Sequence, residues 1–527
     1  MSSPPARLGR AAAGISGLTA ASRLTGFGRV LVVTAVLGTT YLGNTYQAAN
    51  TVPNLVFELF AAGALHAVLV PTLVATLDGE GRAAAERLAA GVLGAVLAGL
   101  AVVTAIGMAL SPLLMRIVAA GIDDATVRDA QVQLGTVFLL VFLPQLALYG
   151  VGLVATGALH ADQRFTAPAA APIANNLVVV AAYALFWWLR RDAGPWPTDG
   201  LDAPEVAVLA GGTTLGVVAL TAVPVLALRR TGFRLRPRWH VRDPLVRRLA
   251  RHGGWAVLQV AATQVVLLAV LLLANPVPGG VVVFQFALTF FLLPVALVGV
   301  PIATAVFPRL SRQERDGVAG NDLLRRSTVT VLALLLPAAA ALVALAWPIV
   351  RVTAFGQAAD VGLAPLAHAV MALAPGLAGY ALVFLFTRAF YAKGDARTPA
   401  LLVVMAMLVA VVVMVVVAPQ VDLEDRVTVV ALAHSGGYLL AAGLLWKRLV
   451  LDQRLGIARI VGGLVGAALV AGAVMFAITA GIDPTGRVTS RLIGALAGLV
   501  GVAVYAGAAR LAGVRLPDVV RLEPARG

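Results

Sequence analysis

The sequence contains no cysteine, so it has no disulfide, no thiolate metal site and no cysteine nucleophile. Charged residues are also scarce, since Asp, Glu, Lys and Arg make up 12% of the 527 residues, against about 25% in typical soluble proteins. Hydrophobic residues account for 60%. A soluble protein of this length has too little interior to hide that much apolar surface. These features exclude a soluble enzyme, a disordered chain and a fibrous protein, and they predict an all-α polytopic membrane protein.

Charge of one sign dominates the few charged residues. The 40 Lys and Arg residues exceed the 25 Asp and Glu residues and give a net charge of +15; only Lys393 and Lys447 are lysines. In a soluble protein this excess would suggest nucleic-acid binding, but in a membrane protein it follows from basic cytoplasmic loops. We therefore expect no nucleic-acid partner. The six histidines are scattered without metal-ligand spacing, so we expect no metal site and no cofactor.

Long apolar segments are abundant, and about 20 apolar residues suffice to span a bilayer. The sequence predicts fourteen transmembrane helices. Their approximate ranges are 14–38, 46–76, 88–114, 130–158, 167–190, 204–228, 253–274, 280–307, 325–346, 364–391, 398–418, 426–449, 458–480 and 488–512.

The basic residues are distributed unevenly between the two predicted sides of the membrane. With loops assigned alternately from a cytoplasmic N-terminus, the outer side carries eight of them: Arg116, Arg128, Arg190, Arg191, Arg351, Arg426, Arg487 and Arg491. Most of the others fall on the cytoplasmic side, including nine between residues 229 and 251. This is the positive-inside pattern, so we predict that both termini are cytoplasmic and that the helix count is even.

The strongly basic loop after the sixth predicted helix divides the chain. We predict four parts in order: an N-terminal six-helix lobe (1–228), a basic cytoplasmic linker (229–252), a C-terminal six-helix lobe (253–449), and helices 13 and 14 with a cytoplasmic tail (450–527).

Two short proline-containing motifs occur in both lobes. The turn that ends at Pro168 recurs at Pro399, 231 residues later, and Val70-Pro71 recurs as Phe307-Pro308 at an offset of 237. These similar offsets predict two parallel six-helix repeats related by an axis along the membrane normal. The alternative is that short proline turns match by chance.

Isolated polar residues interrupt three predicted spans. An arginine at the centre of a membrane helix costs about 2.5–3.5 kcal/mol on insertion scales, so it needs a cavity or a partner. Arg29 is the deeper of the two arginines in the first helix and is a cavity candidate. Arg23 is either a second cavity residue or a side chain that reaches the cytoplasmic interface. The pair Asn175-Asn176 in the fifth helix serves either packing or function.

The second predicted helix is unusually polar. Gln47, Asn50, Asn54 and Glu58 follow one another at spacings of three, four and four, so they form one helical stripe. Glu58 is the one acidic residue placed deep in a span. Two interpretations remain open: an ion pair between Glu58 and Arg29, or a polar seam between helices. The candidate substrate-binding residues are therefore Arg23, Arg29, Glu58, Asn50 and Asn54, and none is expected to be catalytic.

Several motifs occur in a fixed order along the chain. They are SRLTGFGR at 22–29, PNL at 53–55, LFAAGA at 59–64, RFTAP at 164–168, PVALVGVPIATAVFPRLS at 294–311 and DARTP at 395–399. Together they resemble the motifs of the MurJ (MviN) family, the lipid II flippases of the multidrug/oligosaccharidyl-lipid/polysaccharide exporter superfamily.

This resemblance implies a transporter, not an enzyme, in the bacterial cytoplasmic membrane. It implies two six-helix lobes around a central cavity, with a groove for the lipid tail formed by helices 13 and 14. The substrate it implies is lipid II, an undecaprenyl-diphosphate-linked peptidoglycan precursor moved outward by alternating access. The implied partners are this polyprenyl-linked glycan, membrane lipids and cell-wall synthesis proteins. The family's helix-1 cavity arginines correspond to Arg23 and Arg29, and arginine offers a bidentate fork to phosphate oxygens.

Several charged positions of the family pattern differ in this chain. Asn44 and Ala62 stand where the family has acidic residues, Thr289 replaces a helix-8 arginine, and Val56–Glu58 lacks the helix-2 arginine. Two related alternatives therefore stay open, namely a paralogous flippase for another polyprenyl-linked glycan and a degenerate flippase that acts as a cell-envelope scaffold. More distant alternatives are a drug antiporter that uses Glu58 and a membrane glycosyltransferase, which would need an acidic group on an outer loop.

Overall fold

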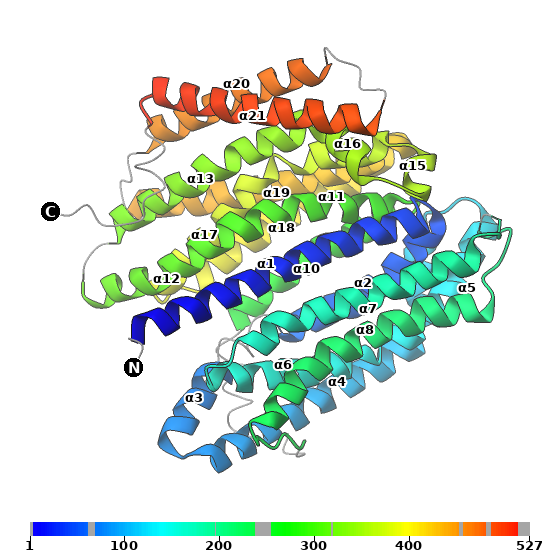
Figure 1. Cartoon of the computed structure of the whole chain (residues 1–527), viewed down its shortest axis with the longest axis horizontal. Helices are drawn as coiled ribbons and strands as arrows, with labels where there is room; N and C mark the ends of the chain where they lie inside the picture. The colour runs from blue at the N-terminus through cyan, green and yellow to red at the C-terminus, as the bar shows by residue number, and fades with distance from the viewer. Residues whose placement is uncertain are drawn as a thin grey trace. The chain divides into compact units, whose positions relative to one another are not determined.

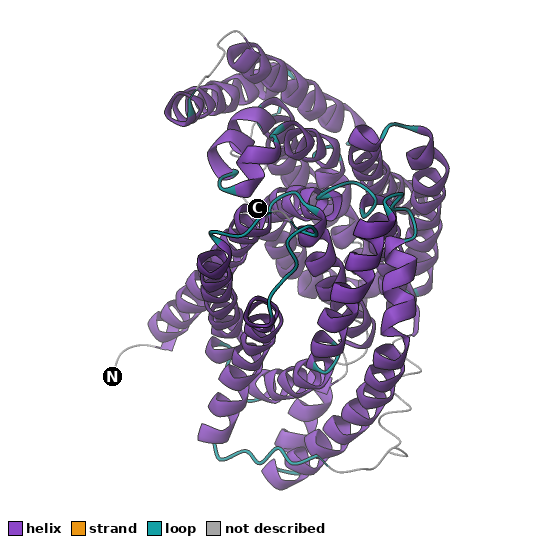
Figure 2. Ribbon diagram, turned by 90° about the vertical axis from the view of Figure 1, so that its right-hand side faces the viewer, coloured by secondary structure: helices purple, strands orange, loops and turns teal. Residues whose placement is uncertain are grey.

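The computed structural model describes residues 4–61, 69–194, 196–237, 254–317, 320–452, 457–480 and 486–514. Regular structure in these residues is helical throughout (Figure 2). Thirteen helical spans among them are long and apolar enough to cross a membrane. The prediction of an all-α multi-pass membrane protein is confirmed. The second predicted span, 46–76, is not among these thirteen. It corresponds to two helices on either side of residues 62–68, which lie outside the described residues.

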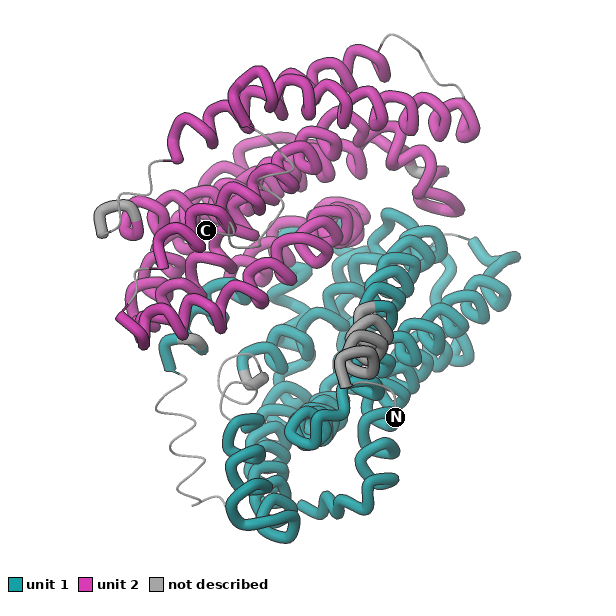
Figure 3. The backbone as a smooth tube through the Cα atoms, turned by 60° about the vertical axis from the view of Figure 1, so that its left-hand side comes forward, with its two compact units in different colours: residues 1–264 teal, residues 265–527 magenta. Residues whose placement is uncertain are grey.

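The chain forms two compact units, residues 1–264 and 265–527 (Figure 3). The helices of the first unit are α1 Pro4–Leu37, α2 Tyr41–Ala61, α3 Val70–Gly79, α4 Arg82–Ala119, α5 Ala125–Phe142, α6 Gln145–Ala161, α7 Thr166–Arg190 and α8 Ala203–Arg230 (Figure 1). Helix α10, Gly254–Ala274, contains the boundary between the units. Most of the predicted linker lies outside the described residues, so the division at 229–252 stays a prediction.

The second unit contains the remaining helices. They are α11 Gly280–Pro294, η2 Val295–Gly299, α12 Val300–Arg315, α13 Asn321–Ala344, α14 Ala346–Thr353, α15 Gln357–Val361, α16 Ala364–Leu373, α17 Gly376–Ala392, α18 Arg397–Val417, η3 Ala418–Gln420, α19 Leu423–Asp452, α20 Ala458–Ala480 and α21 Arg487–Leu511. Helices α20 and α21 pack on each other and on α13 through an apolar core that includes Leu464, Met475 and Tyr505. The Tyr505 hydroxyl donates a hydrogen bond to the Ala333 carbonyl at 2.9 Å.

Within the first unit, α7 packs against both α1 and α8, whereas α2 packs mainly against α5. The α7–α8 contact is close because α8 presents glycines to it. A Cβ atom at Gly216 would overlap the side chains of Val179 and Asn175, and one at Gly212 would overlap Ala182. This close packing fixes α7, which in turn positions α1.

The two proline turns that suggested a repeat begin helices in the same way. Pro168 is the third residue of α7 and Pro399 is the third residue of α18. The Asp395 carboxylate accepts a hydrogen bond from the Thr398 backbone N–H at 2.9 Å, in the first turn of α18. The two turns thus have matching positions at the starts of helices, while the six-plus-six repeat itself stays a prediction.

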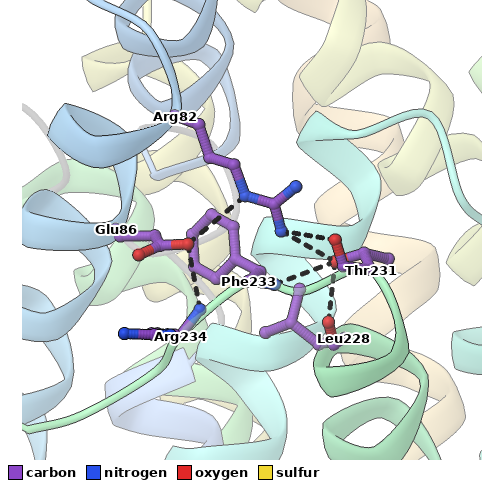
Figure 4. Close-up of polar contacts among 6 residues, drawn as sticks. All are labelled: Arg82, Glu86, Leu228, Thr231, Phe233 and Arg234. Atoms are coloured by element: carbon purple, nitrogen blue, oxygen red, sulfur yellow. Dashed lines mark hydrogen bonds and ion pairs between the residues drawn. The ribbon is translucent and has the colours of Figure 1, made fainter.

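A cluster of polar contacts fastens the chain after α8 to the start of α4 (Figure 4). The Arg82 guanidinium donates to the Thr231 carbonyl at 2.6 Å and to the Glu86 carboxylate at 3.3 Å. The same carboxylate accepts the backbone N–H of Arg234 at 3.0 Å. Arg82 also lies over the Phe233 ring, with its Cζ atom 5.8 Å from the centroid. We call these five residues the α4–α8 clasp.

The clasp leads to a test by hydrogen exchange. Replacing Glu86 with alanine removes the acceptor for the Arg234 N–H, so we expect amide exchange across residues 231–236 to accelerate about 5- to 30-fold, the equivalent of about 1–2 kcal/mol. Exchange in the middle of α8 should not change. The neighbouring exposed Arg87 is the matched control, and an equal acceleration in Arg87→Ala would contradict the assignment.

The connection between α7 and α8 is organised around one arginine. Arg190 donates to the carbonyls of Gly194, Asp199 and Gly200 at 2.9–3.0 Å. It also forms an ion pair with Glu205 at 3.0 Å, in which the two side chains are only 9% and 7% exposed. Glu205 completes the capping box of α8 by accepting the Asp202 backbone N–H at 3.0 Å. One buried ion pair therefore holds the whole α7–α8 connection.

Candidate functional site

The two helix-1 arginines occupy different environments. Arg29 is half-buried and Arg23 is exposed. Six residues separate them, which places them about 120° apart around α1. Arg29 lies about 12 Å from the C-terminal end of α1 along its axis, inside the depth of a bilayer core. Neither arginine forms an ion pair with a described residue.

The segment between the two arginines is fixed to α7. The Asn176 side-chain amide donates to the Thr25 hydroxyl at 3.1 Å, and this hydroxyl donates to the Ser22 carbonyl at 3.1 Å. Asn176 is buried, and Asn175 lies against Gly216 in the α7–α8 contact. Asn176 therefore joins α7 to the part of α1 between Arg23 and Arg29.

A buried network of hydroxyl groups lies near Arg29. The Tyr46 hydroxyl is 2.7 Å from the Tyr183 hydroxyl and 2.7 Å from the Thr213 hydroxyl. Arg29 lies within electrostatic range of Tyr46, Tyr149 and Tyr183. Helices α2, α6, α7 and α8 each contribute a residue to this group, which we call the tyrosine cluster (Tyr46, Tyr149, Tyr183 and Thr213).

The ring of Tyr46 is held by aromatic packing as well as by hydrogen bonds. It makes edge-on contacts with Phe138 and Phe142 of α5, at centroid distances of 5.9 and 6.0 Å. Tyr149 stacks on Phe57 of α2 at 4.9 Å. The rings of Tyr46, Phe138 and Phe142 are fully buried, so close packing restrains Tyr46 in the cluster.

The polar stripe of α2 lies beside its buried face. Pro53 and Ala49 are buried, whereas Asn50 and Asn54 are half-buried and Glu58 is exposed. The Asn54 amide donates to the Asn50 carbonyl at 2.8 Å, within the helix. Among the described residues no ion pair joins Glu58 to Arg29, and Glu58 has no other ion-pair partner there. The hypothesis of an Arg29–Glu58 pair is therefore not supported, and the assignment of the five candidate residues to substrate binding stays a prediction.

Sequence reasoning missed the tyrosine cluster and identified only charged residues and asparagines of α1, α2 and α7. Ala62 lies outside the described residues, and Thr289 donates a hydrogen bond to the Gln285 carbonyl within α11. Among the described residues there is no group of three His, Asp or Glu side chains able to hold a metal ion.

Tyr46→Phe tests whether the hydroxyl network stabilises the fold. The substitution keeps the ring packing but removes the bond to Tyr183, so we expect a loss of about 1–2 kcal/mol of unfolding free energy. Thermal unfolding of the purified protein in detergent measures it. Adding Tyr183→Phe to Tyr46→Phe should lower the unfolding free energy much less than Tyr183→Phe does alone. The reason is that the hydrogen bond between the two hydroxyls is already lost in Tyr46→Phe. Strictly additive losses would contradict this network.

Comparison with solved structures defines the fold class. The fold matches a structure titled "Lipid II flippase MurJ, inward closed conformation", with a TM-score of 0.72, 16% identity, and coverage of 94% of this chain and 98% of that one. It also matches an inward-facing multidrug resistance MATE transporter of the MOP superfamily, with a TM-score of 0.64, 16% identity and coverage of 83% and 96%. The chain therefore has the all-helical multi-pass fold of these two structures.

Sequence comparison then identifies the family. The family model "Lipid II flippase MurJ" matches residues 33–491, so the chain belongs to the MurJ family. It is 31% identical to "Probable lipid II flippase MurJ" of Rhizobium tropici, over 73% of this chain and 71% of that protein. It is 29% identical to the protein of that name from Rhizobium meliloti, with 82% and 80% covered. It is 26% identical to "Lipid II flippase MurJ" of Burkholderia cenocepacia, over 90% of this chain and 91% of that protein.

Proposed function

We propose that this protein moves lipid II across the cytoplasmic membrane by alternating access. Membership of the MurJ family supports the substrate, and the relatives above carry the lipid II flippase name over most of the chain. The fold supports the mode of transport, because it is shared with proteins whose structures are titled inward closed and inward-facing. We also propose that cell-wall synthesis proteins act beside it, since they supply and consume this precursor.

The observation that carries the proposal is Arg29. It is a half-buried arginine at membrane depth with no ion-pair partner among the described residues. Such a charge is costly in a membrane unless an anionic ligand or water meets it. The diphosphate of a polyprenyl-linked precursor is such an anion, and a guanidinium contacts two of its oxygens at once. We propose that Arg29 binds the diphosphate and that Arg23 assists from the next face of α1.

The remaining candidate residues suit the uncharged part of the precursor. Asn50 and Asn54 present amides, and Glu58 presents a carboxylate, on one stripe of α2. Amides and carboxylates bind sugar and peptide groups through hydrogen bonds. The tyrosine cluster contributes indirectly, because its packing restrains Tyr46 within electrostatic range of Arg29.

Complementation tests the substrate. The chain is expressed in cells depleted of their own lipid II flippase, and we expect it to restore growth and cell shape. An accumulation assay for lipid II on the inner leaflet should show the precursor declining in parallel. Absence of rescue, with normal amounts of the protein in the membrane, would contradict lipid II transport and favour another polyprenyl-linked glycan or a scaffold role.

A further inference from the structure

A polar hollow lies at the end of the α4–α5 hairpin, apart from the tyrosine cluster. Its volume is about 610 Å³, and its lining comes from the last turn of α4 and the first turns of α5: Arg116, Ala120, Arg128, Asp129, Val132 and Gln133. Both helices belong to the first unit. The predicted topology places this end on the outer side of the membrane.

The hollow has two arginines with free hydrogen-bonding capacity. Arg116 is exposed and has no hydrogen bond or ion pair with a described residue. Arg128 donates from one nitrogen to the Ile122 carbonyl at 3.0 Å, and a guanidinium has five N–H donors, so others remain. The nearby Asp124 is occupied as the N-cap of α5, where it accepts the Thr126 N–H at 2.8 Å. Both arginines therefore stay available to an anion.

Asp129 adds the opposite charge to the same lining. It forms no ion pair with a described residue. A simple anion gains nothing from a carboxylate at this place, whereas a ligand with both a phosphate and a hydrogen-bond donor matches all three charged groups. Gln133 offers a further amide one turn after Asp129.

An exposed apolar surface continues from the hollow along both helices. On α4, Ile106, Leu110, Leu113 and Ile117 recur at spacings of four, three and four and are 43–54% exposed. On α5, Val137 and Leu140 are also exposed. Apolar surface left exposed on a membrane-spanning helix faces acyl chains. Below the hollow the two helices approach closely, because a Cβ atom at Gly135 would overlap the Met115 side chain. The α4–α5 hairpin is therefore closely packed next to the hollow and has a lipid-facing side.

We propose that this hollow binds the headgroup of a membrane phospholipid. Arg116 and Arg128 hold the phosphodiester, Asp129 accepts a hydrogen bond from a hydroxyl or ammonium group of the headgroup, and the acyl chains lie along α4 and α5. This lipid is bound outside the transport site, so the inference does not depend on lipid II being the cargo.

Lipid binding to the purified full-length protein tests the proposal. Phosphatidylglycerol is titrated in detergent and followed by native mass spectrometry for the wild type and for Arg116→Gln/Arg128→Gln. We expect affinity to fall about tenfold or more in the double variant, since two charge-assisted phosphate contacts are lost. Arg191→Gln is the matched control, because Arg191 is exposed on another connection of the same unit, beside Asp192. Its affinity should equal that of the wild type.

Further variants and ligands separate the outcomes. Arg116→Lys/Arg128→Lys should keep most of the binding, which shows that charge and not misfolding is responsible. Phosphatidylcholine, whose headgroup has no donor, should bind more weakly than phosphatidylglycerol, and Asp129→Asn should reduce that difference. Equal phosphatidylglycerol affinity in the wild type and the Gln/Gln variant would overturn the proposal. Displacement of the lipid by equimolar inorganic phosphate would equally overturn it, because the site would then be one for a free anion.

Discussion

Cells that depend on this chain for lipid II export are expected to lose growth when Arg29 is replaced with alanine. Loss of a bidentate arginine–phosphate contact costs about 2–3 kcal/mol, so lipid II binding by the purified variant should weaken about 30- to 150-fold. Fold stability should not fall, since Arg29 has no ion-pair partner among the described residues to lose. Complementation and lipid II titration measure the two effects.

Conservative and neighbouring substitutions define the role of Arg29. Arg29→Lys keeps the charge but loses the planar fork, so it should give an intermediate affinity. Arg23→Ala should have a smaller effect, because Arg23 is exposed and points to another face of α1. Wild-type rescue by Arg29→Ala, at matched membrane levels, would remove Arg29 from the transport site.

The α7–α8 connection should be the most sensitive point for stability. Replacing Arg190 with alanine leaves the buried Glu205 carboxylate without its partner and strands three loop carbonyls. Breaking one side of a buried ion pair typically costs about 3–5 kcal/mol. We expect a large decrease in the thermal unfolding temperature of the purified protein, together with rapid amide exchange across residues 191–202.

The adjacent arginine is the control for this effect. Arg191 pairs with Asp192 at 3.1 Å, but these side chains are 57% and 87% exposed. Exposed pairs contribute at most about 1 kcal/mol, so Arg191→Ala should be close to the wild type. The double variant Arg190→Ala/Glu205→Ala should be more stable than the sum of the single losses predicts, because no carboxylate is then left unpaired. Equal losses from Arg190→Ala and Arg191→Ala would refute the buried-pair account.

The architecture was largely predictable because the hydropathy of each segment decides whether it can span a membrane. Spans such as 398–418 are almost entirely apolar, and α18 occupies Arg397–Val417. The second span was harder to recognise, since the stripe from Gln47 to Glu58 lowers its hydropathy, and α2 is not among the thirteen candidate spans of the described residues. The count of apolar segments still included this span as 46–76. The motif resemblance is confirmed separately by the family model that matches residues 33–491.

The site was less predictable because periodicity identifies a helix face but not its neighbours. The Tyr46 bonds to Tyr183 and Thr213 join residues 137 and 167 positions apart. A tyrosine in an apolar span carries no local signal of such a partner. The same limit explains why spacing alone could not decide between an Arg29–Glu58 pair and a polar seam. Helix α1 packs chiefly on α7, where its Thr25 meets Asn176. Contacts across distant helices depend on packing that the spacing along one helix does not encode.

In a chain without cysteine, the Arg190–Glu205 pair closes a connection that no disulfide can close. Connections on the outer side of a membrane are often cross-linked by disulfides, whose formation depends on an oxidising environment. Here a guanidinium joins three carbonyls and a carboxylate, so it closes the connection as soon as α7 and α8 pair. The hairpin can therefore mature without any oxidase, and reducing agents should leave it intact.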